Sequence, residues 1–168
     1  MTDLEFFESL ELLKGASKET IKEFPKIVKK KDLPKGTVIV REGEEGDSMF
    51  ILRQGEVEVS MSITLPVSGK GREKVLVSLK PGSIFGEMAF VFGKEQRSAT
   101  VVAKTNVVVY EIASRDFEQF INANPQDGVF IFRNIAKIIA NRLRKANRDI
   151  AKLTTVLSVV LDRMERSS

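Results

Sequence analysis

The residues best suited to chemistry lie between Phe85 and Val101. Gly86 allows the backbone to approach a ligand closely, and the residues after it can form a short helical turn whose N–H groups face an anion. Arg97 can add a bidentate charged contact, and Ser98 can add a hydroxyl donor. This combination predicts a binding site for a phosphate group.

A single carboxylate, Glu87, stands between Glu73 and Glu95 in otherwise apolar surroundings. A carboxylate beside a phosphate repels it, so Glu87 must address another part of the ligand, and sugar hydroxyls are donors that a carboxylate accepts. Phosphate and hydroxyl together indicate a nucleotide. The residue types alone leave a second interpretation open, in which Glu87 and Arg97 form a structural ion pair and Gly86 is only a turn residue.

The chain has 168 residues and contains no cysteine and no histidine. This length is typical of one domain with a core of its own. The missing residue types exclude disulfides, thiolate nucleophiles, zinc sites built on Cys or His, and catalytic triads with an imidazole base. We therefore expect a protein that is not an enzyme and holds no metal.

The net charge of +4 is unevenly distributed. Residues 129–168 carry nine basic and three acidic side chains, a net charge of +6, and the first 128 residues carry −2. A basic tail is compatible with nucleic acid, a membrane surface, an acidic partner or a solvated helix. The start of the chain has no basic leader pattern, and the apolar runs are too short to cross a bilayer, so we expect a soluble, cytoplasmic protein without membrane contact.

Three regions differ in pattern along the chain. Residues 1–32 are predicted to be a helical segment, with Ser17 as an N-cap and a break at Pro25. Residues 33–128 contain short strand-like runs separated by glycine and proline turns, which is typical of a sandwich or barrel. Within them, 61–74 is expected to be a long loop, and a plain insertion is favoured over a contact with a partner. The strand-like runs are Thr37–Val40, Met49–Leu52, Val57–Ile63, Val75–Leu79, Thr100–Ala103 and Val107–Ile112.

Residues 129–168 are predicted to form one long helix, because neither Gly nor Pro occurs after Gly128. Its apolar residues repeat at alternating spacings of three and four, which favours a coiled-coil homodimer. The alternative is a helix that packs on its own barrel. The repeating positions are Leu143, Ala146, Ile150, Leu153, Leu157, Val160 and Met164.

Residues 85–101, F-G-E-M-A-F-V-F-G-K-E-Q-R-S-A-T-V, closely resemble the phosphate-binding cassette of the cyclic nucleotide-binding domain family. Glu87 and Arg97 are ten positions apart, as in the bacterial catabolite-activator branch. Residues 33–39 and 43–59 also resemble the first four strands of that family and their glycine turns. The resemblance extends from residue 5 to about residue 148 and selects the nucleotide interpretation of the cassette.

The resemblance implies a mainly β fold: an eight-stranded β-roll of jelly-roll type with N-terminal helices and a long C-terminal helix. It also implies that a cyclic mononucleotide binds inside the roll. Residue by residue, Arg97 pairs with the cyclic phosphate, and Ser98 and the Ala99 amide add hydrogen bonds. Glu87 accepts from the ribose 2′-OH, and Gly86 and Met88 contribute backbone contacts. The implied pocket wall consists of Val59, Leu76 and Val77.

In the catabolite-activator branch the long helix contacts the purine. The alignment puts Arg142, Ala146 and Asn147 at the purine-facing positions, and Ala146 departs from the pattern because a hydroxyl is usual there. Asn147 can both donate and accept, so it can match adenine or guanine. Ser98 does not discriminate the two bases. We favour cAMP as the ligand, with cGMP or a cyclic dinucleotide as alternatives.

The transcription factors of this family continue into a helix-turn-helix domain, for which the sequence leaves no room after the long helix. We therefore expect a free-standing sensor that signals by repositioning its C-terminal helix toward an effector protein of unknown identity. The alternatives are a nucleic-acid-binding regulator that uses the basic helix, a sensor of another cyclic nucleotide, and a scaffold domain that binds no ligand. A single Tyr and no Trp leave few platforms for base stacking, so nucleic acid is disfavoured.

Overall fold

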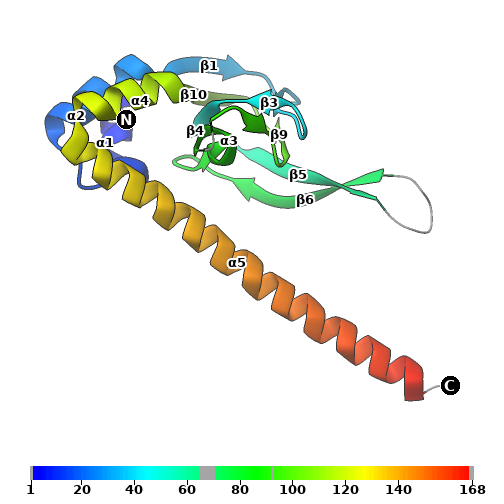
Figure 1. Cartoon of the computed structure of the whole chain (residues 1–168). Helices are drawn as coiled ribbons and strands as arrows, with labels where there is room; N and C mark the ends of the chain where they lie inside the picture. Colours follow the sequence, from blue (N-terminus) through cyan, green and yellow to red (C-terminus); the bar gives the residue numbers. More distant parts are fainter. Residues whose placement is uncertain (1, 65–70, 92, 167–168) are drawn as a thin grey trace.

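Two four-stranded antiparallel sheets face each other and enclose an apolar interior (Figure 1). The computed structural model describes residues 2–64, 71–91 and 93–166. Within them, one sheet has the order β1-β10-β4-β7, the other has the order β2-β9-β5-β6, and β3 and β8 pair separately. The predicted eight-stranded β-roll with flanking helices is confirmed. The strands are β1 (Lys29–Leu33), β2 (Val38–Val40), β3 (Glu45–Gly46), β4 (Ser48–Gln54), β5 (Val57–Thr64), β6 (Gly71–Leu79), β7 (Ile84–Phe85), β8 (Glu95–Gln96), β9 (Thr100–Ala103) and β10 (Val107–Ala113).

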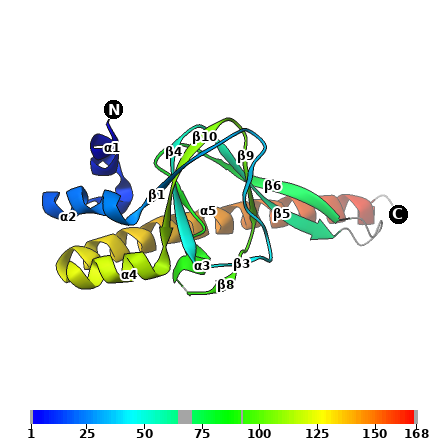
Figure 2. The ribbon, with the colours of Figure 1, turned by 90° about the horizontal axis from the view of Figure 1, so that it is seen from above.

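Most of the helices gather at one end of the roll, and the last of them runs past it (Figures 1 and 2). The α-helices are α1 (Asp3–Ser9), α2 (Lys18–Glu23), α3 (Glu87–Val91), α4 (Ser114–Ala123) and α5 (Pro125–Arg166), and the 3₁₀ turns are η1 (Glu11–Leu13) and η2 (Phe24–Ile27). The predicted cap is present, since the Ser17 hydroxyl accepts from the Thr20 N–H at 3.2 Å. Pro25 lies in η2, where the chain leaves α2.

Strands β4 and β10 are buried on both faces, which explains their nearly continuous apolar sequence. Leu52 and Val109 point between the sheets, and Ile51 and Ile112 point toward the helices; all four side chains are fully buried. On the helical side they meet a cluster rich in phenylalanine. Its aromatic members are Phe6, Phe7, Phe24, Phe90, Tyr110, Phe117 and Phe120. Each such side chain stabilises the fold by about 1.5–3 kcal/mol when buried.

Lys29–Leu33 forms strand β1, although residues 1–32 were predicted to be helical. The helical prediction is wrong there because the strand is an edge of its sheet, where β10 is its one partner among the described strands, and it exposes its charged side chains. The alternation that would mark a half-buried strand is therefore missing from K-K-K-D-L. Charged residues on an edge strand also discourage pairing with another chain.

The roll ends earlier, and the long helix begins earlier, than the predicted boundary at residue 128. Strand β10 ends at Ala113, and α5 starts at Pro125, so Gly128 lies inside its first turn. Proline is well tolerated at a helix start. Gly128 allows α4 and α5 to pack closely, since a Cβ at this position would be 3.0 Å from the Cβ of Ile121. The glycine therefore marks a close helix contact rather than a domain boundary.

Most of the segment 61–74 is strand rather than the predicted long loop. Met61 to Thr64 pairs with Gly71 to Lys74 as the far end of the β5–β6 hairpin. The remaining residues, 65–70, lie outside the described part of the chain. The predicted run Val57–Ile63 ends one residue before β5 does, whereas the start of β6 at Gly71 was missed because Gly71 to Lys74 shows no clear alternation.

Helix α5 carries the heptad positions along a face that is largely exposed, and Ala146, Ile150 and Leu153 of this face border the roll. Leu143, Ile150, Leu157 and Met164 are each between 58% and 63% exposed. Among the described residues, no helix combines the length and apolar character needed to cross a membrane.

Candidate functional site

The predicted cassette is a strand, a glycine, a short helix and a returning strand: β7, Gly86, α3 and β8. Gly86 has a φ of +76°, which glycine adopts at little cost. A Cβ at this position would also lie 2.9 Å from Nη1 of Arg97 and 3.1 Å from the carbonyl oxygen of Ser48. Both the backbone angle and the close approach therefore require glycine, and the arginine is the neighbour that it accommodates.

Arg97 is buried, with only 8% of its surface exposed, and it is held by neutral oxygens. Its Nη1 donates to the carbonyl oxygens of Ser48 at 2.6 Å and of Gly86 at 3.1 Å. Its Nη2 donates to the Ser48 hydroxyl at 3.0 Å. The guanidinium is thus fixed along one edge by strand β4 and by the cassette itself.

The charge of Arg97 is maintained in this buried position. Burial lowers the pKa of the guanidinium, while the nearby negative charges of Asp47 and Glu111 act in the opposite direction. Arginine keeps its proton at any physiological pH because its pKa starts so high. Among the described residues, no carboxylate bonds directly to Arg97. A buried cation of this kind is a good partner for an anionic ligand.

Glu87 is buried to the same extent and pairs with the long helix rather than with Arg97. Its Oε1 accepts from Nη1 of Arg142 at 2.7 Å, and Nη2 of Arg142 donates to the carbonyl oxygen of Ile84. The structural ion pair between Glu87 and Arg97 that the sequence left open is therefore absent from this arrangement. Arg142 instead links α5 to the acidic end of the cassette.

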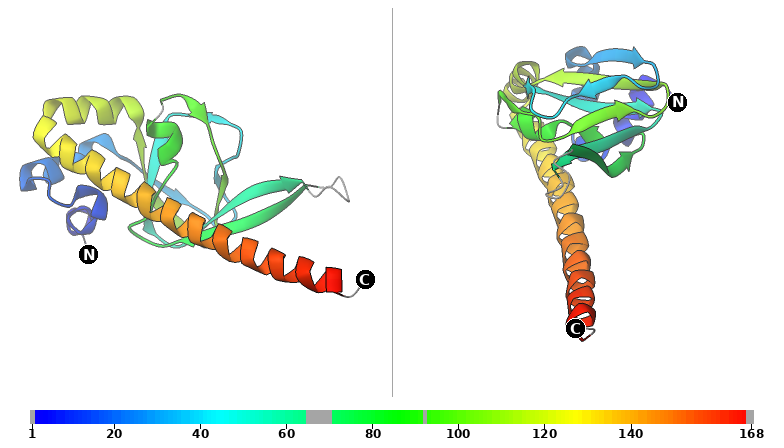
Figure 3. Two further views of the ribbon diagram at one scale, coloured as in Figure 1. Left: turned by 60° about the horizontal axis from the view of Figure 1, so that its bottom comes forward. Right: turned by 90° about the vertical axis from the view of Figure 1, so that its right-hand side faces the viewer.

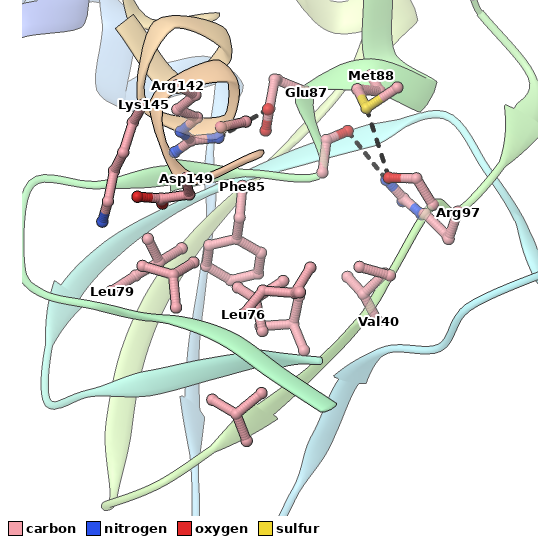
Figure 4. A pocket seen from close by; sticks show the side chains of 18 of the residues that line it. Val40, Leu76, Leu79, Phe85, Glu87, Met88, Arg97, Arg142, Lys145 and Asp149 are labelled. Carbon is pink, nitrogen blue, oxygen red and sulfur yellow. Dashed lines mark hydrogen bonds and ion pairs between the residues drawn. The ribbon is translucent and has the colours of Figure 1, made fainter. Parts of the chain in front are cut away.

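A cavity of about 650 Å³ lies between the roll and α5, with these charged groups at its edge (Figure 4). This volume is in the range of small-molecule sites. The cavity brings together ten of the eleven predicted site residues: Val59, Leu76, Val77, Gly86, Glu87, Met88, Arg97, Ser98, Ala99 and Arg142. Ser98 and Met88 also contact each other, at 3.4 Å between hydroxyl and sulfur.

Asn147 is the exception, since it is exposed and does not line the cavity. A helix turns by about 100° per residue, so Asn147 points well away from the face that carries Arg142 and Ala146. Arg142 lies at the cavity, as expected. Its guanidinium is bonded to Glu87, the predicted ribose contact, and is therefore not free to face the purine alone.

Two charged residues of α5 were missed by the sequence reasoning. Lys145 and Asp149 line the cavity on the same wall as Arg142, as Figure 4 shows. The signal was available, because positions 142, 145, 146 and 149 repeat at helical spacing. The further apolar lining was also not singled out; it consists of Val40, Val75, Leu79, Phe85, Val101, Ile150 and Leu153.

Comparisons with known proteins agree with this geometry. The family model of the cyclic nucleotide-binding domain matches residues 30–124. Glutaminase 1 of Bradyrhizobium diazoefficiens is 33% identical over 90% of this chain and 24% of its own length. The CRP-like cAMP-activated global transcriptional regulator of Mycobacterium tuberculosis is 25% identical over 84% of this chain and 59% of its own length.

The crystal structure of the Thermus thermophilus catabolite activator protein superposes with a TM-score of 0.72 at 25% identity, covering 86% of this chain and 63% of that one. The chain thus spans between about a quarter and three fifths of the length of the two curated relatives. The family model covers more than half of the chain and includes the whole cassette. The chain therefore belongs to the cyclic nucleotide-binding domain family, in its catabolite-activator-like branch.

Proposed function

We propose that this chain is a sensor that binds a cyclic purine mononucleotide, with cAMP as the first candidate, in the cavity between the roll and α5. The observation that carries the proposal is the buried Arg97. Its hydrogen bonds to the described residues use Nη1 and one N–H of Nη2. A guanidinium has five N–H donors, so Nε–H and the second N–H of Nη2 are left to grip two oxygens of a phosphate.

The sugar is proposed to bind at Glu87. The carboxylate accepts from the ribose 2′-OH, which places the phosphate at Arg97 and Ser98 on the other side of the cassette. Arg142 already pairs with Glu87 at 2.7 Å. A bound ribose therefore shares or replaces this ion pair, and the occupancy of the cavity is communicated directly to α5.

The purine is proposed to lie against the apolar wall, between Leu76 and the face of α5. Lys145 and Asp149 offer a donor and an acceptor at this end of the cavity. The case for cAMP draws on the similarity to a regulator named as cAMP-activated. Asn147 does not line the cavity of its own chain, so it gives no support for adenine over guanine there. We therefore take cGMP as the second ligand to test.

Signalling is proposed to pass through α5 to a homodimer and from there to an effector protein. The cavity wall and the heptad repeat share one side of the helix, because Ala146, Ile150 and Leu153 line the cavity. Leu157, Val160 and Met164 continue the same repeat on the exposed part of α5. Two of its basic residues, Arg142 and Lys145, are directed to the cavity, which reduces the support for nucleic-acid binding. No enzymatic step is proposed for the site.

Calorimetry on Arg97→Ala tests the proposal. We expect the loss of this side chain to cost about 2–5 kcal/mol of binding free energy, because the phosphate loses its charged partner in a buried site. The matched control is Lys94→Ala, which removes an exposed cation three residues away whose partner is Glu45. The control should bind as the unmodified chain does.

The ligands are cAMP, cGMP, a cyclic dinucleotide and linear AMP. The ligand that binds should raise the stability of the chain by about 2.7 kcal/mol at a hundred times its Kd. A loss of less than tenfold for Arg97→Ala would mean that the ligand binds elsewhere. Stabilisation by none of the four would contradict the sensor function.

A further inference from the structure

We propose that the distal part of α5 joins two homodimers, so that the chain assembles as a tetramer through an antiparallel four-helix contact. The proposal builds on the homodimer proposed above and goes beyond it. It rests on the distal part of α5, which begins at Leu153, the last residue of the helix that lines the cavity. This part of the helix extends beyond the roll (Figure 3). We call this surface the distal apolar band; it consists of Leu153, Val156, Leu157, Val160, Leu161 and Met164.

The distal apolar band is too wide for one partner helix. At about 100° per residue, the heptad positions of a two-stranded coiled coil occupy an arc of about 60°. Val156 and Leu161 stand at the flanking g and e positions, where charged residues are usual, and extend the arc to about 140°. Val159 extends it further, to about 200°. A helix with so broad an apolar face packs against two neighbours, as in a four-helix bundle.

The distal apolar band is largely exposed in the described part of the chain. Its side chains are between 47% and 63% exposed, which is a contiguous apolar surface on an otherwise charged helix. Contiguous apolar surface of this kind marks an interaction site. Dimerisation alone would bury the positions of Leu153, Leu157 and Val160 and leave Val156 and Leu161 facing solvent.

The charge distribution of α5 favours further copies of the same chain as the occupant. Residues 129–148 contain six basic side chains and no acidic one, so identical helices repel each other there. Residues 149–166 contain three basic and three acidic side chains, which lets identical helices meet without net repulsion. The neutral part coincides with the distal apolar band.

An antiparallel arrangement of the two dimers pairs opposite charges and keeps the rolls from colliding. When Leu157 of one dimer lies opposite Val160 of the other, Leu153 lies opposite Met164 and Lys152 lies opposite Glu165. In the same register Val156 lies opposite Leu161, so the two positions that dimerisation leaves exposed are covered, and an opposite-charge pair closes each end. The rolls lie along the proximal part of α5 (Figure 1), so this direction carries the two pairs of rolls away from each other.

Light scattering coupled to size-exclusion chromatography tests the tetramer on the full chain, from micromolar to near-millimolar concentration. We expect four chain masses for the unmodified protein and two for the double variant Val156→Gln/Leu161→Gln. The matched control Ser158→Gln, on the polar face of the same segment, should keep four. Leu157→Gln, in the shared seam, should dissociate further, to one chain mass.

Each other outcome overturns the proposal in a distinct way. Two chain masses for the unmodified protein at every concentration would overturn the tetramer, leave the homodimer standing and assign the band to a different protein. One chain mass would overturn both. Four masses retained in Val156→Gln/Leu161→Gln would place the tetramer contact elsewhere. Circular dichroism and thermal unfolding of each variant show that the changes in mass occur in folded chains.

Discussion

The central residue of the site, Arg97, is buried against neutral oxygens and not against a carboxylate. Two of these oxygens belong to Ser48, which offers its carbonyl to Nη1 and its hydroxyl to Nη2. Glu111 approaches the same hydroxyl at 3.3 Å and pairs with Lys31 at 2.7 Å. The orientation of the guanidinium therefore depends on strand β4, far from the cassette in sequence, and its free edge is directed by Ser48.

Ser48→Ala should weaken cyclic nucleotide binding without removing it. The variant loses the acceptor for Nη2 but keeps the backbone carbonyl for Nη1, so we expect Kd to rise about three- to tenfold, the equivalent of one hydrogen bond. Ser48→Thr, which keeps a hydroxyl, should restore most of the affinity. Calorimetry gives Kd, and Ser158→Ala serves as the control for the same change at an exposed position. Equal affinities for Ser48→Ala and the unmodified chain would contradict the positioning role.

Glu87 should discriminate ribose from deoxyribose. In the unmodified chain, cAMP is expected to bind about 10- to 100-fold more tightly than 2′-deoxy-cAMP, because a hydrogen bond to a buried carboxylate is lost. In Glu87→Ala the two ligands should differ by less than about threefold. Glu87→Ala also frees Arg142 from its ion pair. This affects the binding of both ligands equally, so it cancels in the ratio of their two Kd values. Glu95→Ala, an exposed carboxylate in β8, should retain the full ratio.

At the scale of elements, the segments that sequence reasoning located best are those whose pattern is local. The cassette is continuous in sequence, so the residues between Gly86 and Ala99 that line the cavity could be named before any packing was known. The residues of α5 that line the purine end of the cavity could not be predicted in the same way, because they depend on how α5 is rotated about its axis. That rotation is fixed where Ile131 and Ile135 enter the core and the Asn134 amide donates to the carbonyls of Leu12 and Lys14. No local pattern near Asn147 reports contacts made three turns earlier.

The junction between α2 and α5 should make stability depend on pH at the acidic end. Asp127 accepts hydrogen bonds from the hydroxyls of Thr20 and Ser17 and from the Ser17 N–H, and these bonds lower its pKa from the ordinary 3.8. A carboxylate with a lowered folded pKa stabilises the fold above its unfolded pKa. This stabilisation disappears as the pH falls through the lower folded value.

Asp127→Asn should therefore reduce the free energy of unfolding by about 1–2 kcal/mol at neutral pH. The difference from the unmodified chain should shrink as the pH falls below 3.8, the ordinary value. Denaturant unfolding at a series of pH values measures both. Asp32→Asn, on the exposed edge strand, is the control and should show neither effect. A constant difference at all pH values would mean that the charge of Asp127 is irrelevant to the junction.

At the scale of the whole molecule, α5 has a fixed base and, further along, a hydrogen-bonded link to the roll. Its base is held by the Asn134 hydrogen bonds and by the core, and the link is the contact of Arg142 with Glu87 and Ile84. Beyond it the helix borders a cavity rather than packed side chains. The sequence could show that one helix carries both ligand contacts and a heptad seam, but not that a cavity separates this helix from the roll. A helix mounted in this way can respond to the ligand while its base stays in place.

Ligand binding should therefore protect the middle of α5 from hydrogen exchange and leave its base unchanged. With saturating cAMP we expect residues 142–153 to exchange about five- to tenfold more slowly, because the helix closes over the purine, a gain of about 1 kcal/mol in the opening free energy. Residues 131–138 should exchange at the same rate with and without ligand. Arg97→Ala at the same ligand concentration is the control and should show no difference. Slower exchange of the cassette, 84–100, reports that the site is occupied. If the cassette is protected and 142–153 is not, the ligand binds without moving α5, and the signal must leave the roll by another route.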